Sequence, residues 1–265
     1  MKIGILSKRT GNFTGKIKSY FESNGHQVSI FNATNLCINE SLLENDFYIL
    51  KSKHMLYLYA GYYLEANKIP VIPDTSLSYT HKNRIESYFA IKKTGLQLPS
   101  VYMGTFNSLK NKLQDSYFPL ISKPILGSGS KGVRVYNSFN DINPEIEEPL
   151  YLESFIEGTH YLAYFIENDF CICEKKPLSN EHGETNLIES DKEIEEYLKK
   201  WKSRYNLLFG HLDLVREKNT NRLYVVDAGT FPEFSNWKHE IDPVSKVCNL
   251  ILKKFQEVIK LDNIR

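Results

Sequence analysis

The feature that most constrains the fold is a glycine- and serine-rich loop between two β-prone runs. The stretch from Phe118 to Tyr136 reads FPLISKPILGSGSKGVRVY, with an apolar run and a lysine before the loop and β-branched residues after it. Gly127, Gly129 and Gly132 match the pattern G-x-G-x-x-G, which several nucleotide-binding loops share with ordinary turns. The residues on either side of the loop must therefore decide what it does.

Residues 133–136 alternate apolar and polar side chains, which predicts a strand, whereas a Rossmann loop opens a helix. A protein kinase also places its glycine loop in a hairpin, but the kinase lysine follows that loop, and the sequence has no HRD or DFG motif. The remaining interpretation is a hairpin that binds phosphate through the charge of Lys123 and through backbone N–H groups that the glycines leave accessible. The alternative is an ordinary hairpin tip.

Charge and cysteine content narrow the function classes. The 265 residues include 33 basic and 32 acidic side chains. The chain therefore has almost no net charge to attract it to nucleic acid or to a membrane, and a small-molecule ligand is favoured. The four cysteines lack Cys-x-x-Cys spacing, which argues against zinc and for reduced, packed thiols. The apolar run Ile3 to Leu6 is too short for a signal peptide, and no stretch of about 18 apolar residues occurs. These observations predict a cytoplasmic protein.

The first 77 residues alternate expected strands and helices, which predicts an open α/β unit. Strands are expected over 2–7, 26–32, 46–50 and 69–72, and helices over 14–24 and 55–67. Basic residues follow two of these strands, where open α/β sheets bind ligands. They are Lys8, Arg9, Lys51, Lys53 and His54, and they suit either an anionic substrate group or solvent.

The rest of the chain predicts a helix with Lys82 on its first turn, the glycine-rich hairpin, and a second strand-rich unit. Helices are expected over 78–94, 107–115, 192–205 and 244–260; strands over 101–103, 150–156 and 165–177 with a turn at 167–169; a polar loop over 179–186; and a hairpin of 209–216 with 222–228.

The order of several motifs resembles the ATP-grasp superfamily over nearly the whole chain. They are Lys82 before a helix, Lys123 before the glycine loop, the run ESFIEG from Glu153 to Gly158, Asp213, and Asp227-x-x-x-Phe-Pro232. The run TFPEFSN from Thr230 to Asn236 is most similar to RimK and LysX carboxylate-amine ligases. The resemblance implies an ATP-grasp fold of class α/β. Its parts are an N-terminal open α/β substrate domain (1–77), a connecting helix with a small lid (78–152), and a C-terminal α+β subdomain with the metal site (153–265).

The resemblance also implies an ATP site. It places Lys82 and Lys123 on the phosphates, with the loop residues around them, and Glu153 with the backbone of Phe155 and Ile156 at the adenine. The full set of nucleotide-binding residues implied is Lys82, Lys123, Gly127, Ser128, Gly129, Ser130, Gly132, Glu153, Phe155, Ile156, His160 and Lys175.

Asp213 and Asp227 face each other across the predicted hairpin, so their carboxylates can share a Mg²⁺ ion. In the family, an asparagine two residues after the acid is a ligand of a second metal ion. This chain has Gly229 at that position. Either Thr230 or Glu233 is therefore expected to coordinate the second ion, or only one ion binds. His211 replaces an arginine that stabilises the developing oxyanion. The catalytic residues implied are His211, Lys123 and Asp227.

The implied function is ATP-dependent ligation: a small anionic carboxylate becomes an acylphosphate, which an amine or a thiol then takes. The implied cofactors are ATP and one or two Mg²⁺ ions. Two alternatives remain, a kinase resembling the inositol phosphate kinases and a non-catalytic ATP-binding module. Neither nucleic acid nor membrane is an expected partner, and a homodimer stays open.

Overall fold

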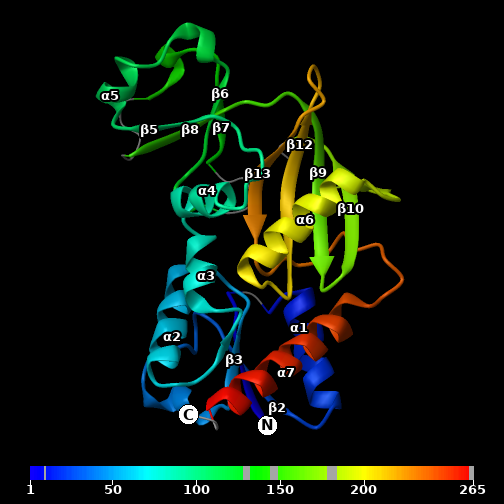
Figure 1. Ribbon diagram of the computed structural model, residues 1–265. Coiled ribbons are helices and arrows are strands. Elements are labelled where there is room, and N and C mark those ends of the chain that lie inside the picture. The colour runs from blue at the N-terminus through cyan, green and yellow to red at the C-terminus, as the bar shows by residue number, and fades with distance from the viewer. Residues whose placement is uncertain (9, 128–131, 144–148, 178–183, 263–265) are drawn as a thin grey trace.

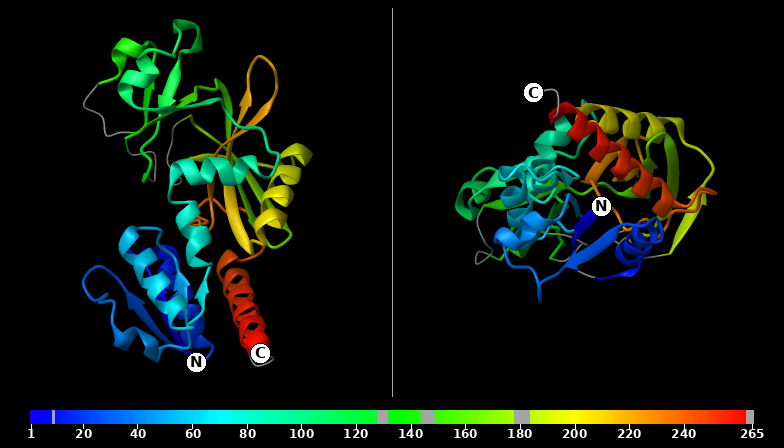
Figure 2. Two further views of the ribbon diagram at one scale, coloured as in Figure 1. Left: turned by 60° about the vertical axis from the view of Figure 1, so that its left-hand side comes forward. Right: turned by 90° about the horizontal axis from the view of Figure 1, so that it is seen from below.

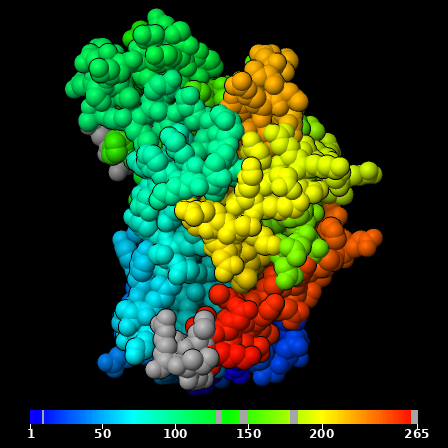
Figure 3. Space-filling model, in the orientation of Figure 1, coloured from blue at the N-terminus to red at the C-terminus, as the bar shows by residue number. Residues whose placement is uncertain are grey.

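The structure is a computed structural model that describes residues 1–8, 10–127, 132–143, 149–177 and 184–262. It contains three sheets that follow one another along the length of the molecule (Figure 1). A parallel sheet lies at the N-terminal end, an antiparallel sheet lies in the middle, and a small antiparallel sheet forms a lid. In the space-filling view, the lid and the β12–β13 hairpin are separate projections above the body (Figure 3).

The N-terminal sheet is parallel, in the order β2-β1-β3-β4. Its central strands β1 and β3 are almost fully buried, as parallel strands with covered faces should be. The elements are β1 (Lys2–Leu6), α1 (Asn12–Ser23), β2 (Gln27–Phe31), the 3-10 helix η1 (Glu40–Glu44), β3 (Phe47–Leu50), α2 (Met55–Ala66) and β4 (Val71–Ile72). The predicted α/β opening is confirmed.

The last helix, α7 (Pro243–Asp262), returns to the N-terminal sheet and lies beside α1 (Figures 1 and 2). Phe255 on α7 stacks on Phe47 of β3, with ring centroids 4.4 Å apart. The Tyr20 hydroxyl on α1 donates a 2.9 Å hydrogen bond to Asn249 Oδ1. One apolar core therefore joins the two ends of the chain.

The middle sheet is antiparallel, in the order β11-β10-β9-β12-β13. Its strands are β9 (Gly158–Ile166), β10 (Asp169–Lys175), β11 (Thr185–Ile188), β12 (Phe209–Glu217) and β13 (Leu223–Gly229). Helix α6 (Lys192–Tyr205) covers one face with Ile194, Leu198 and Trp201, which are fully buried. The predicted 209–216 and 222–228 hairpin is confirmed. The early start of β9 and the strand β11, which begins inside the expected polar loop, were not predicted.

The lid sheet has the order β5-β8-β6-β7 and a small core of its own. Its elements are β5 (Val101–Gly104), α5 (Phe106–Lys110), the 3-10 helices η2 (Asp115–Tyr117) and η3 (Phe139–Asp141), β6 (Leu120–Ser122), β7 (Arg134–Tyr136) and β8 (Leu150–Ser154). Leu120 pairs with Tyr136, so the predicted glycine-loop hairpin is confirmed. Helix α5 ends at Lys110, earlier than expected.

The helix expected over 78–94 is wrong, because two helices stand there: α3 (Thr75–Thr80) and α4 (Arg84–Lys92). The side chain of Asn83 accepts hydrogen bonds from the backbone N–H groups of Ile85 and Glu86, so it caps a new helix. Lys82 therefore lies in the break between two helices and not on a first turn.

Two further expectations concern the cysteines and membrane segments. The four cysteines are free, and Cys171, Cys173 and Cys248 are buried, as expected. Across the described part of the chain, no helix combines the length and the hydropathy needed to cross a bilayer.

Candidate functional site

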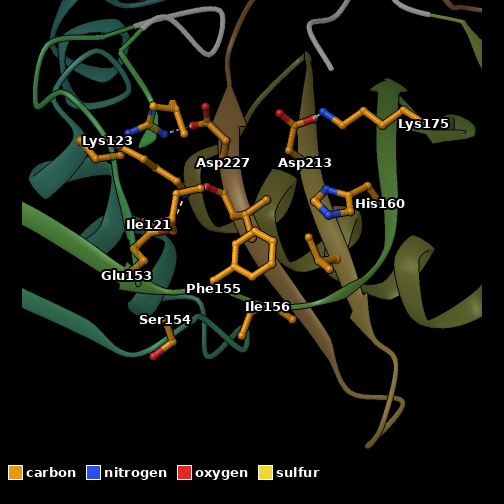
Figure 4. A pocket seen from close by; sticks show the side chains of 14 residues that line it. Ile121, Lys123, Glu153, Ser154, Phe155, Ile156, His160, Lys175, Asp213 and Asp227 are labelled. Atoms are coloured by element: carbon orange, nitrogen blue, oxygen red, sulfur yellow. Dashed lines mark hydrogen bonds and ion pairs between the residues drawn. The ribbon is translucent and has the colours of Figure 1, made fainter. Parts of the chain in front are cut away.

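A cavity lies between the lid and the face of the middle sheet that α6 leaves uncovered (Figure 4). Its lining is apolar at one end and charged at the other. The apolar side chains are Ile121, Val133, Phe155, Ile156, Val215 and Val226; the polar and charged ones are Arg84, Lys123, Glu153, Ser154, His160, Lys175, Asp213 and Asp227.

The two expected metal carboxylates are brought together by strand pairing. Asp213 on β12 is the direct cross-strand partner of Asp227 on β13. Side chains of directly paired residues share one face of a sheet, and here that face is the cavity face. The two carboxylates lie at the charged end of the cavity, with Phe155 and Ile156 at the other end (Figure 4). The prediction that they face each other is confirmed.

Arg84, which sequence reasoning missed, pairs with Asp227. Arg84 Nη1 lies 2.7 Å from Asp227 Oδ1, and the arginine side chain is 14% exposed. Burial alone would raise the pKa of Asp227, but the charge and hydrogen bond of Arg84, together with the charges of Lys123 and Lys53, outweigh burial and hold this pKa below its usual range. The capping pattern at Asn83 could have shown that Arg84 begins a helix at the cavity.

Lys175 makes a similar pair on the other carboxylate. Its Nζ donates a 3.0 Å hydrogen bond to Asp213 Oδ1. Lys175 is also the cross-strand partner of His160, whose pKa is lowered by burial and then by the charge of Lys175. His160 is therefore neutral at pH 7 and offers one ring nitrogen as donor and the other as acceptor.

Lys123 forms the third pair, with Glu153. The Lys123 ammonium donates to Glu153 Oε2 and, at 2.9 Å, to the carbonyl of Val226. The hydroxyl of Tyr151 donates to the other oxygen of Glu153, and burial, together with this charge, raises the pKa of Tyr151. Glu153 is 4% exposed and lines the cavity, and its expected role at the adenine stays a prediction.

The remaining nucleotide-binding candidates belong to the cavity lining or to the glycine loop. Phe155 and Ile156 line the apolar end, but the N–H of Phe155 already donates to the carbonyl of Pro119 at 3.1 Å. Gly132 has a φ of +76°, which favours glycine, and a Cβ there would lie 2.8 Å from Pro124 Cγ. A Cβ on Gly127 would also lie close to that proline, at 3.2 Å from its Cβ. Ser128, Gly129 and Ser130 lie outside the described residues.

His211 and Gly229 are cross-strand partners that fit together. A Cβ on Gly229 would lie 2.2 Å from Cε1 of the His211 ring, so the imidazole fills the space above the glycine. The glycine found in place of the family asparagine therefore has a steric role. His211 Nδ1 is buried and has no hydrogen-bond partner among the described residues.

Six of the expected site residues that the structure describes do not line the cavity: Lys82, Gly127, Gly132, His211, Thr230 and Glu233. Thr230 is 1% exposed and lines a separate cavity beside β4 and α7. Glu233 accepts a 2.6 Å hydrogen bond from Lys51 of the N-terminal unit. The pKa of Lys82 is lowered by burial and then by the charges of Arg84 and Lys8.

The cavity residues fit a magnesium ion whose coordination is shared with a phosphate. Asp213 and Asp227 offer carboxylate oxygens, the ligand type that Mg²⁺ prefers, and Mg²⁺ usually takes one or two carboxylates with phosphate and water. Among the described residues, no group of three or more His, Cys, Asp or Glu side chains is arranged to hold a metal. Asp213 and Asp227 would therefore supply two carboxylate ligands, and a nucleotide would have to supply others.

Comparison with known proteins matches part of the chain to a protein family and to a curated protein. Residues 81–200 match the ATP-grasp domain family. An uncharacterised protein of Methanocaldococcus jannaschii is 29% identical over 96 residues, which span 36% of this chain and 25% of that protein.

Two solved structures resemble the whole chain. The RimK-domain ATP-grasp protein of Sphaerobacter thermophilus has a TM-score of 0.77 at 11% identity, covering 94% of this chain and 99% of that one. The D-alanine–D-alanine ligase of Bacillus anthracis complexed with ATP has a TM-score of 0.73 at 16% identity, covering 99% of each chain. Residues 81–200 therefore resemble an ATP-grasp domain in sequence, and the chain as a whole has the fold of these ATP-grasp proteins.

Proposed function

We propose that this protein is an ATP-dependent ligase that activates a small carboxylate as an acylphosphate and transfers it to an amine or a thiol. The observation that carries the proposal is the facing pair Asp213 and Asp227 at the charged end of a cavity whose other end is apolar. An adenine suits the apolar end and phosphates suit the charged end. The fold shared with an ATP-complexed ligase supports this orientation.

In this proposal Lys123, Arg84 and Lys175 are the cations that neutralise the phosphates, and His160 contacts the sugar. A magnesium ion held by Asp213 and Asp227 would supply further positive charge at the transferring phosphoryl group. The substrate carboxylate oxygen attacks the γ-phosphorus and the bond to ADP breaks. The amine nitrogen then attacks the acyl carbon, loses a proton and expels phosphate. The protein contributes position and charge, which dominate phosphoryl transfer.

His211 is assigned to the acyl end of the site. It lies on β12 two residues before Asp213, and alternation along a strand places both side chains on the cavity face of the sheet. Its imidazole can donate a hydrogen bond to an oxyanion as the acyl carbon becomes tetrahedral.

One observation favours a second function, a nucleotide-binding module without turnover. Both expected metal carboxylates are already paired with cations, Asp227 with Arg84 and Asp213 with Lys175. If these pairs persist when nucleotide binds, the cations occupy the positions that a metal needs, and phosphoryl transfer loses its main electrostatic support.

Both functions are tested by incubating the protein with MgATP and pooled amino acids, amines and thiols, followed by mass spectrometry. A ligase forms ADP, phosphate and a product with the mass of the two reactants less one water. Nucleotide binding without ADP formation identifies the silent module, and a phosphate ester with ADP overturns both in favour of a kinase. The variant Asp213→Asn is the matched control, in which formation of ADP and of the product should fall by at least about a hundred-fold.

A further inference from the structure

A second cavity, which we call the α7 cavity, lies where the N-terminal unit meets the middle sheet and α7. Its volume is about 530 Å³, within the range of roughly 300–1,000 Å³ that is usual for small-molecule sites. Its lining comes from residues 70–74 at β4, from residues 205–209 between α6 and β12, and from α7. Among the described residues, none lines both this cavity and the one that holds Asp213 and Asp227.

The most buried part of the lining is apolar except for one hydroxyl. Phe209 and Thr230 are 2% and 1% exposed, and the two residues of β4, Val71 and Ile72, are also buried. The Oγ1 atom of Thr230 is buried and has no hydrogen-bond partner among the described residues. A buried hydroxyl without a partner costs free energy, which a partner from outside the chain can recover. The cavity thus combines an apolar wall with one polar group that can accept or donate.

Two carboxylates lie side by side on the same cavity. Glu65 stands near the end of α2, and its Oε1 accepts a 2.9 Å hydrogen bond from the backbone N–H of Thr75, the residue next to Asp74. The Asp74 Oδ1 accepts a 2.9 Å hydrogen bond from the N–H of Leu77 and so caps α3. In the part of the chain that the structure describes, neither carboxylate forms a salt bridge. Burial raises the pKa of Glu65, and a cation beside the two acids would offset this cost.

The positive charge on the cavity is smaller and already shared. Among the described residues of the lining, the only basic side chain is that of Lys254 on α7. Its Nζ lies 3.6 Å from Oε2 of Glu257, which is close to one turn away on the same helix. The cavity therefore carries more negative than positive charge, which disfavours a phosphate or a carboxylate and favours a cation.

We propose that the α7 cavity is a second ligand site, which takes a small molecule with an apolar body and a protonated amino group. The apolar body packs on Phe209 and β4, and the amino group donates hydrogen bonds to the carboxylates of Glu65 and Asp74. This site is separate from the nucleotide site, and its existence does not depend on the ligase function.

The test compares molecules that share an apolar body and differ in charge. Calorimetry on the full chain at pH 7 measures binding of tryptamine beside its alcohol analogue tryptophol, of phenethylamine beside 2-phenylethanol, and of indole-3-acetate. At least one amine should bind about ten-fold or more tightly than its alcohol, since a charge-assisted hydrogen bond is stronger than a neutral one, and indole-3-acetate should bind more weakly than tryptophol. The proposal is overturned if neither amine binds at millimolar concentration, or if the alcohols or the acid bind as tightly.

Saturation with ADP and Mg²⁺ shows whether the two sites are separate. Because the two cavities share no described lining residue, the affinity for the amine should change by less than about two-fold when the nucleotide is bound. Displacement of the amine by ADP would place it in the nucleotide cavity and would overturn the proposal.

A charge variant tests the acid rim. Glu65→Gln keeps an oxygen for the N–H of Thr75 but removes the charge, so it should abolish about ten-fold of the preference for the amine and leave the affinity for the alcohol within about two-fold. Glu22→Gln is the matched control, because Glu22 lies on α1 with its side chain 45% exposed, and it should change neither. A full preference for the amine in Glu65→Gln contradicts the proposal.

A volume variant tests the cavity itself. Val258→Trp on α7 puts an indole ring at the lining and should weaken binding of amine and alcohol alike by about ten-fold or more. Ile259→Trp adds the same ring at the next position of α7, which is exposed and outside the lining, and should leave binding unchanged. Equal binding in the two variants overturns the site. If urea unfolding shows that Val258→Trp does not fold, the result for Glu65→Gln decides.

Discussion

The cavity between the lid and the middle sheet differs from a second set of lysines, Lys8 after β1 and Lys82 between α3 and α4, in how positive charges are balanced; we call this set the lysine edge. In the cavity each cation has a carboxylate partner: Lys123 has Glu153, Arg84 has Asp227 and Lys175 has Asp213. At the edge, Lys8 and Lys82 have no such partner among the described residues. The two regions therefore present a different balance of charges to a ligand.

A ligand that enters the cavity must exchange partners with both signs of charge. MgATP can do so, because its phosphates replace the carboxylates on the cations while its metal ion replaces the cations on the carboxylates. The lysine edge offers positive charge alone. The difference shows that a site lined by ion pairs presents both signs of charge to a ligand, whereas lysines without carboxylate partners present only one.

The largest expected effect is on turnover, from the carboxylates of the cavity. Asp213→Asn and Asp227→Asn should each lower the rate of ADP formation by at least about a hundred-fold, because each removes charge that supports several kcal/mol of transition-state stabilisation. Asp227→Asn should also lower the free energy of unfolding by about 1.5–3 kcal/mol, since it leaves Arg84 with a weaker partner. Stopped-assay kinetics and urea unfolding check these results. Retained turnover in both variants would show that the metal lies elsewhere.

The next effect concerns ATP affinity. Lys123→Ala should weaken ATP binding by roughly ten- to a hundred-fold, since it removes a charge-assisted hydrogen bond worth about 1.5–3 kcal/mol. It also leaves Glu153 buried without its cation, so Lys123→Met with Glu153→Gln is the matched variant for separating affinity from folding. If calorimetry shows an unchanged ATP affinity in this double variant, Lys123 does not bind ATP and the distinction between the two regions is wrong.

A smaller effect is expected at the contact between His211 and Gly229. Gly229→Asn should lower the free energy of unfolding by about 1–3 kcal/mol, the usual cost of overpacking, because its Cβ would overlap the imidazole. His211→Ala should relieve that loss in the double variant, as urea unfolding can show. If the single variant is as stable as wild type, the ring moves freely and the contact does not explain the glycine.

The smallest effect, counted per pH unit, is on the free energy of unfolding and comes from His81, at the break between α3 and α4. Burial and then the charge of Lys53 lower its pKa to about 3. Between the unfolded value near 6.5 and about 3, the unfolded chain binds a proton that the folded chain does not. Stability is therefore full above pH 6.5 and falls by about 1.4 kcal/mol per unit as the pH drops. His81→Gln should flatten this slope in unfolding curves at pH 5 and 7; an unchanged slope would contradict the assignment.

Local rules predicted the features that depend on neighbouring residues. The alternation of residues 133–136 predicted the hairpin at the glycine loop, and strand pairing placed Asp213 opposite Asp227, as observed. The family order of motifs correctly predicted the ATP-grasp fold, which the structural matches show. These features depend on periodicity and on turn residues, which the sequence states directly.

Features that depend on distant contacts could not be predicted. Arg84 pairs with Asp227 across 143 positions, and only the fold brings α4 to β13. Nor does the sequence alone show that the ring of His211 fills the space above Gly229. The position of Lys82 was misjudged because the capping side chain of Asn83 was overlooked, and this signal was available.

The packing of α7 against α1 and β3 also sets an order of folding events during synthesis. The N-terminal sheet has its strands once residue 72 is made, but part of its core waits until residues 243–262 appear. Contacts of such long sequence separation form slowly, and until then the apolar face of β3 is open to wrong partners. The lid, whose core comes from residues 102–152, has no such delay. A ribosome-bound chain should therefore protect the lid from proteolysis before it protects its own beginning.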